Sequence, residues 1–281
     1  MRVSFGLVLV LLFSAGAAVA QLEHGSVLIV AYSPNEIVMA ADSRVTNVQT
    51  GQFRDNYCKL AVPGGKILFG GTGLVESIGG FDSVGLVRRI VSQMNPTGGD
   101  GFVQQVATRW ANAMEQNYAK LPSNLVSEFI RENGGARALD CTMFAGAEPG
   151  GGLSLIRARV YYRGSPGGAP SLQGKIEIIP LQSPQPNFLS FAGCGNIDIL
   201  QSLLPPKTDW ARSTVEQWKH STGDIESQAA IQVVQLTIAH EKPQSYGGKQ
   251  VVLVGGPVDA AEVRQNGSVR WLQRKPDCAA N

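Results

Sequence analysis

A serine and an aspartate near the two ends of one apolar hairpin are the residues of this chain best suited to chemistry. The segment 24–44 reads as two apolar strands joined by a Ser-Pro-Asn-Glu turn at 33–36, with proline at the second turn position. A hairpin centred on that turn pairs positions whose numbers add up to about 69. Ser26 is then opposite Ser43 and next to Asp42. A hydroxyl and a carboxylate are therefore expected close together at one end of a sheet.

A serine hydroxyl needs a base before it can act as a nucleophile. No G-x-S-x-G sequence surrounds any serine, which argues against an α/β-hydrolase. A free α-amino group on Ser26 itself could serve, because its unperturbed pKa is about 7.7–8. A nearby ammonium would lower that pKa and help to stabilise negative charge. The scheme requires a chain that begins at Ser26, a buried lysine beside it, and backbone N–H groups for an oxyanion.

Residues 1–20 have the pattern of a secretory signal peptide. Arg2 is followed by an apolar stretch and then by the small-x-small sequence 18–20 before Gln21. The apolar stretch is about 15 residues long, short of the roughly 20 that a bilayer span needs. We expect cleavage after Ala20, export to the periplasm or medium, and no membrane attachment of the mature chain.

The composition excludes several other classes of function. The chain has 43% hydrophobic and 16% charged residues, which is ordinary for a globular domain. Lys and Arg number 24 against 22 acidic residues, with no long run of one sign, so no nucleic-acid partner is indicated. The three histidines, His24, His220 and His240, are isolated and lack ligand spacing, so we expect no metal and no cofactor.

Four cysteines in an exported chain are too few for a disulfide scaffold. They are Cys58, Cys141, Cys194 and Cys278, and no two form a CxxC pair. One bridge is possible, and the sequence does not specify its partners. Cys194 is interpreted as a small buried residue rather than a nucleophile.

The remaining elements must position the hairpin, and their order predicts the class of fold. The sequence predicts strands, two helices, strands, helices and strands again. The strand predictions are Ser26–Tyr32, Ile37–Ala41, Cys58–Val62, Lys66–Phe69, Cys141–Ala147, Leu153–Tyr162, Lys175–Pro180, Asn187–Ala192, Gln250–Val254, Ala260–Arg264 and Ser268–Leu272. The helix predictions are 84–94, 103–114, Asn196–Leu204, Thr208–His220 and Glu226–His240. A parallel βαβ array would alternate more strictly. We expect an α+β domain over 26–281, with two antiparallel sheets packed together and helices outside.

On these residues the sequence resembles the proteasome β-subunit family of N-terminal-nucleophile hydrolases. In that family the mature chain begins with Thr after a Gly, and an apolar hairpin leads to an Ala-x-Asp-Ser-Arg segment. A lysine strand and a Gly-rich strand end follow. The corresponding segments of this sequence are Gly25-Ser26, Ala40-Ala41-Asp42-Ser43-Arg44, Cys58-Lys59-Leu60 and Phe69-Gly70-Gly71-Thr72-Gly73.

The resemblance implies a four-layer αββα sandwich and a role for each matched residue. Ser26 takes the position of the nucleophile, Asp42 that of the acid, Lys59 that of the lysine, and the N–H of Gly73 that of the oxyanion donor. Arg44 is a supporting neighbour of the acid. Cleavage at Gly25–Ser26 would remove residues 21–25 as a short propeptide. The family also implies a peptide or amide substrate and a ring-like homo-oligomer.

The downstream resemblance is weaker and contains three departures. The segments 140–146, 191–195 and 245–248 look like the family's strand and turn segments after the helix pair. Serine replaces threonine as the nucleophile. Cys194, a weaker donor, stands where the family has a supporting serine. Tyr246 stands at a second serine position and Pro243 where an acid is expected.

Three functions remain open on the sequence. Ser26 could be the nucleophile of an exported peptidase or amidohydrolase. The chain could instead be a non-catalytic proteasome-like subunit for binding or assembly, in which Ser26 merely begins a strand. It could also be an exported amidase of the same fold for a small-molecule amide.

Overall fold

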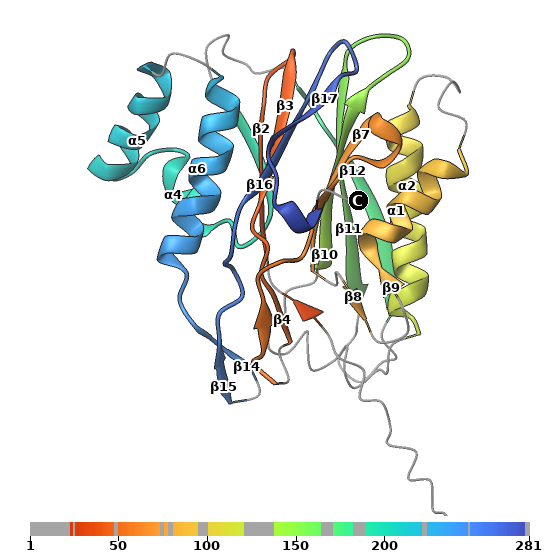
Figure 1. Cartoon of the computed structure of the whole chain (residues 1–281), viewed down its shortest axis with the longest axis horizontal. Helices are drawn as coiled ribbons and strands as arrows, with labels where there is room; N and C mark the ends of the chain where they lie inside the picture. The colour runs from red at the N-terminus through yellow and green to blue at the C-terminus, as the bar shows by residue number, and fades with distance from the viewer. Residues whose placement is uncertain are drawn as a thin grey trace, which may run out of the picture.

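The structure is a computed structural model (Figure 1), and it describes most of the chain from the segment just before Ser26 onward. The described residues are 23–24, 26–47, 50–73, 76–77, 81–94, 101–120, 138–163, 171–181, 189–220, 224–246 and 248–278. The predicted signal peptide 1–20 and Gly25 lie outside them. Only residues 23–24 of the predicted propeptide lie inside.

The first five-stranded sheet is built around the N-terminal hairpin. Its order is β13-β2-β3-β16-β17, and all of the pairings are antiparallel. The strands are β2 (Val27–Tyr32), β3 (Glu36–Ala41), β13 (Ser190–Gly195), β16 (Asp259–Arg264) and β17 (Val269–Gln273). Leu28 lies opposite Ala41 and Val30 opposite Met39, which is the register predicted from the turn. Every residue of β2 is buried, as its continuous apolar sequence requires.

The second five-stranded sheet faces the first. Its order is β12-β11-β10-β7-β6, again antiparallel. The strands are β6 (Leu60–Ala61), β7 (Ile67–Thr72), β10 (Ala138–Ala147), β11 (Leu153–Arg163) and β12 (Ser171–Ile179). Between the two sheets lies one apolar core, whose members include Leu28, Met39, Leu68, Met143 and Leu155.

Helices cover the outer face of each sheet (Figure 1). On the second sheet lie α1 (Ser83–Ser92) and α2 (Phe102–Tyr118), with Trp110 packed against the rings of Phe69 and Phe144. On the first sheet lie α4 (Asp198–Leu203), α5 (Asp209–His220) and α6 (Ile225–His240). The predicted helices and the mixed α+β class with antiparallel sheets are confirmed. Among the described helices, none has the length and apolarity that a bilayer crossing requires.

Short strands and one displaced strand depart from the predictions. The unpredicted strands are β1 (Glu23–His24), β4 (Val45–Asn47), β5 (Phe53–Arg54), β8 (Glu76–Ser77), β9 (Phe81–Asp82) and β14 (Gln244–Tyr246). Strand β15 (Lys249–Val251) overlaps the predicted strand Gln250–Val254 but ends earlier. Two or three residues are too few to show an alternating pattern. Strand β6 covers only Leu60–Ala61, so Lys59 precedes the strand predicted to carry it. The remaining elements are the short 3₁₀ turns η1 (Pro63–Gly65) and η2 (Pro276–Cys278).

Two disulfides are present, where the sequence indicated one possible bridge. Cys58 is bonded to Cys278, and Cys141 to Cys194. The second bridge joins β10 of one sheet to β13 of the other, so it crosses the core between the sheets. The first joins the segment before Lys59 to η2. Neither pairing was visible in the sequence because the partners are 220 and 53 positions apart.

Candidate active site

Ser26 lies at the buried end of the hairpin, where strand β2 begins. The pairing with β3 extends one step beyond the regular strands, because the Asp42 N–H donates to the Val27 carbonyl at 3.3 Å. Ser26 is 5% exposed, and its carbonyl accepts the Asn196 N–H at 3.0 Å. The predicted proximity of Ser26 and Asp42 therefore follows from hairpin register.

Asp42 is fully buried and is held by four donors. Its Oδ1 accepts the Val27 N–H at 2.9 Å and the Lys59 Nζ at 2.7 Å. Its Oδ2 accepts the N–H of Gly255 at 2.9 Å and of Arg44 at 3.2 Å. These bonds satisfy the charge of a carboxylate removed from water. They also tie the residue that follows Ser26 to the lysine.

Lys59, the ion-pair partner of Asp42, is unusual because its charged side chain is fully buried. Its ammonium and the Asp42 carboxylate both have no exposed side-chain surface. Burial lowers the pKa of Lys59, while the charge of Asp42 and its hydrogen bond pull that pKa back up. The structure thus brings together Ser26, Asp42 and Lys59, as the sequence predicted.

Gly73 follows the end of β7, beside the start of β2. Its φ is +91°, and an added Cβ would lie 2.8 Å from the Leu139 carbonyl oxygen, so only glycine fits. The neighbouring Thr72 and Ser26 both lie close to Gly195. A Cβ built on Gly195 would lie 2.0 Å from the Ser26 carbonyl oxygen and 3.4 Å from Thr72 Cγ2. Gly73 is therefore placed next to the segment that carries Ser26.

The Arg44 side chain points to a different partner from its backbone. Its N–H donates to Asp42, but its guanidinium forms a bidentate pair with Asp55, with both N···O distances 2.7 Å. That hydrogen bonding raises the pKa of Arg44. The guanidinium also stacks over Phe53 at 3.9 Å from the ring centroid. Arg44 holds the loop that leads to Lys59 rather than touching Ser26.

Cys194 does not play the supporting part that the resemblance assigned to it. Its sulfur is bonded to Cys141, so it has no thiol hydrogen to donate. The residue lies on β13 opposite Leu28 and is buried. The bridge fixes β13 against β10, and thereby places the following Gly195 and Asn196 beside Ser26.

Two groups at the site were missed by the sequence reasoning. Gly255 donates to Asp42 and accepts the Arg44 N–H at 2.9 Å, although the family pattern pointed to 245–248 instead. Glu241, two positions before Pro243, accepts the Asn196 side-chain amide at 2.7 Å. Burial raises the pKa of Glu241, and the Asp42 carboxylate adds to that rise. An acid is therefore present near the site, displaced from the position that was matched.

A cavity of about 570 Å³ opens on the α4–α6 side of Asn196. Its lining includes Trp210 and Glu241, together with the loop that follows α6. The volume is within the range of small-molecule sites.

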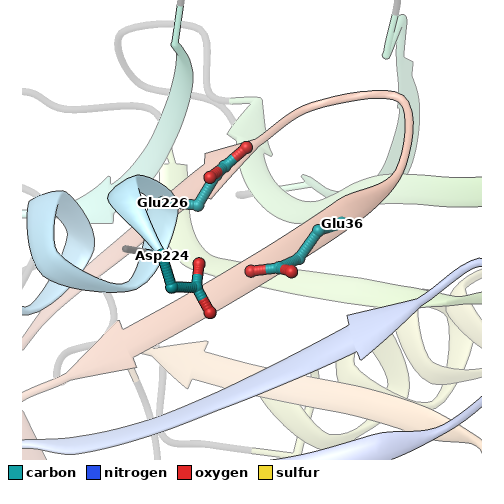
Figure 2. A group of neighbouring side chains, drawn as sticks. All are labelled: Glu36, Asp224 and Glu226. Carbon is teal, nitrogen blue, oxygen red and sulfur yellow. The ribbon is translucent and has the colours of Figure 1, made fainter. Parts of the chain in front are cut away.

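A separate carboxylate cluster lies at the far end of the hairpin. Figure 2 shows Glu36 at the start of β3 facing Asp224 and Glu226 at the start of α6, with ligand atoms within 4.8 Å of one another. Burial, and then the neighbouring carboxylate of Asp224, raise the pKa of Glu36 to about 8. Burial would raise the pKa of Asp224, but hydrogen bonds from Glu36 and Ser227 outweigh it and lower that pKa. Arg264 Nε lies 3.3 Å from Glu36 and 2.9 Å from Glu262, so the arginine cation offsets part of the negative charge of the cluster.

Comparisons with known proteins support the class of fold that this geometry defines, which is proteasome-like. No protein-family model matches the sequence, and no curated protein matches it. Among solved structures, Anbu (ancestral beta-subunit) from Yersinia bercovieri matches with a TM-score of 0.52 and 14% identity, over 89% of this chain and 88% of that one. An Anbu (Gly-1) mutant from Hyphomicrobium sp. strain MC1 matches with a TM-score of 0.49 and 14% identity, over 92% and 89%. The Yersinia structure shows the shared fold.

Proposed function

We propose that the chain is an N-terminal-nucleophile hydrolase of the four-layer αββα type that cleaves peptide or amide bonds, with Ser26 as nucleophile. The observation that carries the proposal is the fully buried Lys59–Asp42 ion pair beside the first residue of β2. Two buried charges are costly unless paired, and an apolar pair of similar volume would stabilise the fold at least as well. Retention of such a pair next to a serine supports a role in chemistry.

In this proposal the Gly25–Ser26 bond is cut first, and the new α-amino group is the base. It takes the proton of Ser26 Oγ as that oxygen attacks the substrate carbonyl, and it gives the proton to the departing amine. Water then hydrolyses the ester on Ser26. The Lys59 ammonium lowers the pKa of the α-amino group, so that the base is neutral near pH 7.

Two donors fit the remaining parts of the reaction. The N–H of Gly73 is assigned to the oxyanion, because Gly73 follows the end of β7, which is paired with β10 and lies near Ser26. Asn196 holds the Ser26 carbonyl, and Glu241 holds the Asn196 side chain. These groups orient the residue whose amine and hydroxyl must react.

The segment before the cleavage point supports self-processing. Glu23 pairs with Asn47 and His24 with Thr46, so β1 is an added strand beside β4. Backbone pairing of this kind holds an extended peptide without regard to its side chains. The departing segment is thus held against β4, the strand that follows Asp42 and Arg44 in the chain.

Export through a signal peptide at 1–20 is part of the proposal. Two disulfides in a chain with four cysteines support an oxidising compartment. Signal cleavage leaves Gln21 as the first residue, so a second cut is required to free Ser26.

Intact mass spectrometry of the purified mature protein tests the proposal. We expect a chain that begins at Ser26, and a Ser26→Ala variant that remains uncut at Gly25–Ser26. The same preparations are assayed on peptide and small-amide substrates, which separates a peptidase from an amidase. A wild-type chain that stays at Gln21 and hydrolyses neither substrate contradicts the mechanism.

A non-catalytic proteasome-like subunit is the second candidate, and the Cys141–Cys194 bridge favours it. The bridge removes a donor from a position where the family has a supporting serine. Such a subunit would assemble into a homo-oligomer. Assembly of the Ser26→Ala variant to the wild-type mass in solution, with no cleavage by either protein, would support this reading.

A further inference from the structure

A second buried ion pair lies beside the first. Lys275 Nζ is 2.8 Å from Asp259 Oδ2, and the two side chains are 5% and 1% exposed. The Lys275 backbone N–H also donates to Asp259 Oδ1 at 2.8 Å. Nothing in the proposed reaction uses this pair, yet its burial is as costly as that of Lys59 and Asp42.

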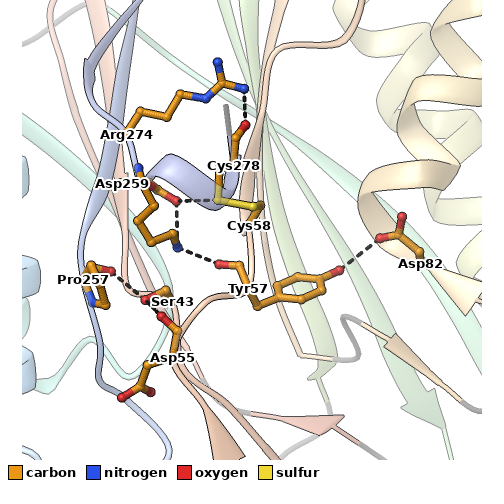
Figure 3. Close-up of a disulfide and its surroundings, with 10 residues drawn as sticks. Ser43, Asp55, Tyr57, Cys58, Asp82, Pro257, Asp259, Arg274 and Cys278 are labelled. Carbon is orange, nitrogen blue, oxygen red and sulfur yellow. Dashed lines mark hydrogen bonds and ion pairs between the residues drawn. A yellow bond between two sulfur atoms is a disulfide. The ribbon is translucent and has the colours of Figure 1, made fainter. Parts of the chain in front are cut away.

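The second pair is bonded to the segment that carries Lys59. Lys275 Nζ donates to the Tyr57 carbonyl at 2.7 Å, two positions before Lys59. The next residue, Cys58, is bonded to Cys278, whose sulfur is 3.6 Å from Asp259 Oδ2. Figure 3 shows Asp259 and the bridge lying against Tyr57.

The same pair is attached to the strand that carries Asp42. Asp259 lies opposite Ala41 in the pairing of β16 with β3, and Asp42 is the next residue. Both ion pairs therefore link the segment 57–59 to the end of β3, the first directly and the second through β16. We propose that Lys275 is a positioning residue, which with Asp259 fixes Lys59 against Asp42 for the chemistry at Ser26. This inference rests on the proposed function for its catalytic consequence.

The charge of Lys275 acts on Lys59 in a definite direction. Burial is the largest cause that lowers the pKa of Lys59, and the Lys275 ammonium lowers it further. The carboxylates of Asp42 and Asp55 act the other way. Loss of the Lys275 charge should therefore raise the pKa of Lys59, and that of an α-amino group beside it, because a repelling cation is gone.

The test is a comparison of Lys275→Met with Lys275→Arg, which keeps the charge, and with Lys207→Met, an exposed lysine outside the site. The first readout is the titration of the Lys59 side chain by ¹⁵N NMR, assigned with a Lys59→Met variant. We expect Lys275→Met to raise the Lys59 pKa. Lys275→Arg and Lys207→Met should leave it near the wild-type value.

The second readout is the pH dependence of self-cleavage and hydrolysis. The acidic limb of the pH–rate profile should move to higher pH in Lys275→Met, because the α-amino base must lose its proton before it can act. A role limited to stability would lower the amount of folded protein without moving the limb. An unshifted Lys59 titration and an unmoved limb in the folded variant overturn the inference.

A neutral double variant, Lys275→Met with Asp259→Asn, covers the case in which the single variant does not fold. It leaves no buried charge alone, and it should shift Lys59 in the same direction. If the double variant also fails to fold, the pair is a stabilising element of the fold and the positioning role is rejected. The NMR readout does not depend on activity. If the wild-type protein is inactive but Lys275→Met still raises the Lys59 pKa, the proposed function is refuted and the positioning role stands.

Discussion

At the residue scale, Asp42 is the group on which the site depends most. It joins the residue after Ser26, the ammonium of Lys59 and the backbone of Gly255, which come from three distant parts of the chain. A carboxylate with four donors is satisfied only while all of these segments are in place. The geometry of the site therefore depends on the packing of the two sheets that brings these segments together.

Removal of one charge from the Lys59–Asp42 pair should cost more than removal of both. Lys59→Met leaves Asp42 buried without its ammonium, and we expect a loss of about 3–5 kcal/mol in the free energy of unfolding. The double variant Lys59→Met with Asp42→Asn should recover part of that loss, while self-cleavage stays absent in both. Urea unfolding and intact mass measure the two effects. Equal stability of the single and double variants would show that the pair is not coupled.

Gly195 offers a test of how closely the site is packed around Ser26. Its φ is +75°, and a Cβ there would collide with the Ser26 carbonyl. Gly151 is a matched control, because its φ is +90° but an added Cβ meets nothing within 4 Å. Gly151→Ala should cost only the roughly 1–2 kcal/mol of left-handed strain. Gly195→Ala should cost more in thermal stability and should also slow self-cleavage. Equal effects of the two substitutions would contradict the packing described for Ser26.

At the element scale, the two ends of the hairpin have different chemistry. One end holds Ser26 and Asp42, and the other end holds Glu36 against the start of α6. Helix α6 packs on β2 and β3. We expect the carboxylate cluster at its N-terminus to influence the stability of that packing. This contact should be sensitive to pH.

The sign of that sensitivity follows from Glu36. Its pKa in the folded chain is about 8, above the value of about 4.3 in an unfolded chain. The folded state therefore binds the proton of Glu36 more tightly than the unfolded state does. The resulting contribution to the free energy of unfolding is fully present below about pH 4.3 and is lost as the pH rises from about 4.3 to about 8. Glu36→Gln should raise the melting temperature at pH 8 by a few degrees and have little effect at pH 5. Glu177→Gln, on the exposed edge strand β12, is the control, and an equal response in both variants would contradict the raised pKa of Glu36.

The elements show which parts of the site could be predicted from sequence. The hairpin register followed from one turn, because period-2 pairing fixes every later contact once the turn is set. It placed Asp42 beside the start of β2 correctly. Lys59 was found through the family pattern, although the strand assigned to it begins one residue later.

Contacts between distant segments could not be predicted in the same way. Gly255, Glu241 and the pair of Asp259 with Lys275 reach the site through sheet order and loop paths that local spacing does not encode. The disulfide partners were hidden for the same reason. Cys194 was assigned a donor role by position alone, whereas its place opposite Leu28, facing the other sheet, determines that it meets Cys141.

At the scale of the whole molecule, the two disulfides should contribute unequally to stability. The Cys58–Cys278 bridge closes a separation of 220 residues and the Cys141–Cys194 bridge one of 53. Because a longer loop restricts the unfolded chain more, replacement of both Cys58 and Cys278 by serine should cost about 1 kcal/mol more than the same change at Cys141 and Cys194. Urea unfolding of the two double variants measures the difference. A larger loss for the shorter loop would show that packing between the sheets outweighs chain entropy.

The bonds from Lys275 and Cys278 to the segment before Lys59 have a consequence for when the site comes into being. In a chain made from its N-terminus, Ser26 and Asp42 emerge well before Lys275 and Cys278. Until then the segment 57–59 lacks both the ion contact and the covalent bond that hold it. Cleavage at Gly25–Ser26 should therefore be postponed until Lys275 and Cys278 have been made and have bound the segment 57–59, which would protect partly folded chains and their neighbours from premature hydrolysis.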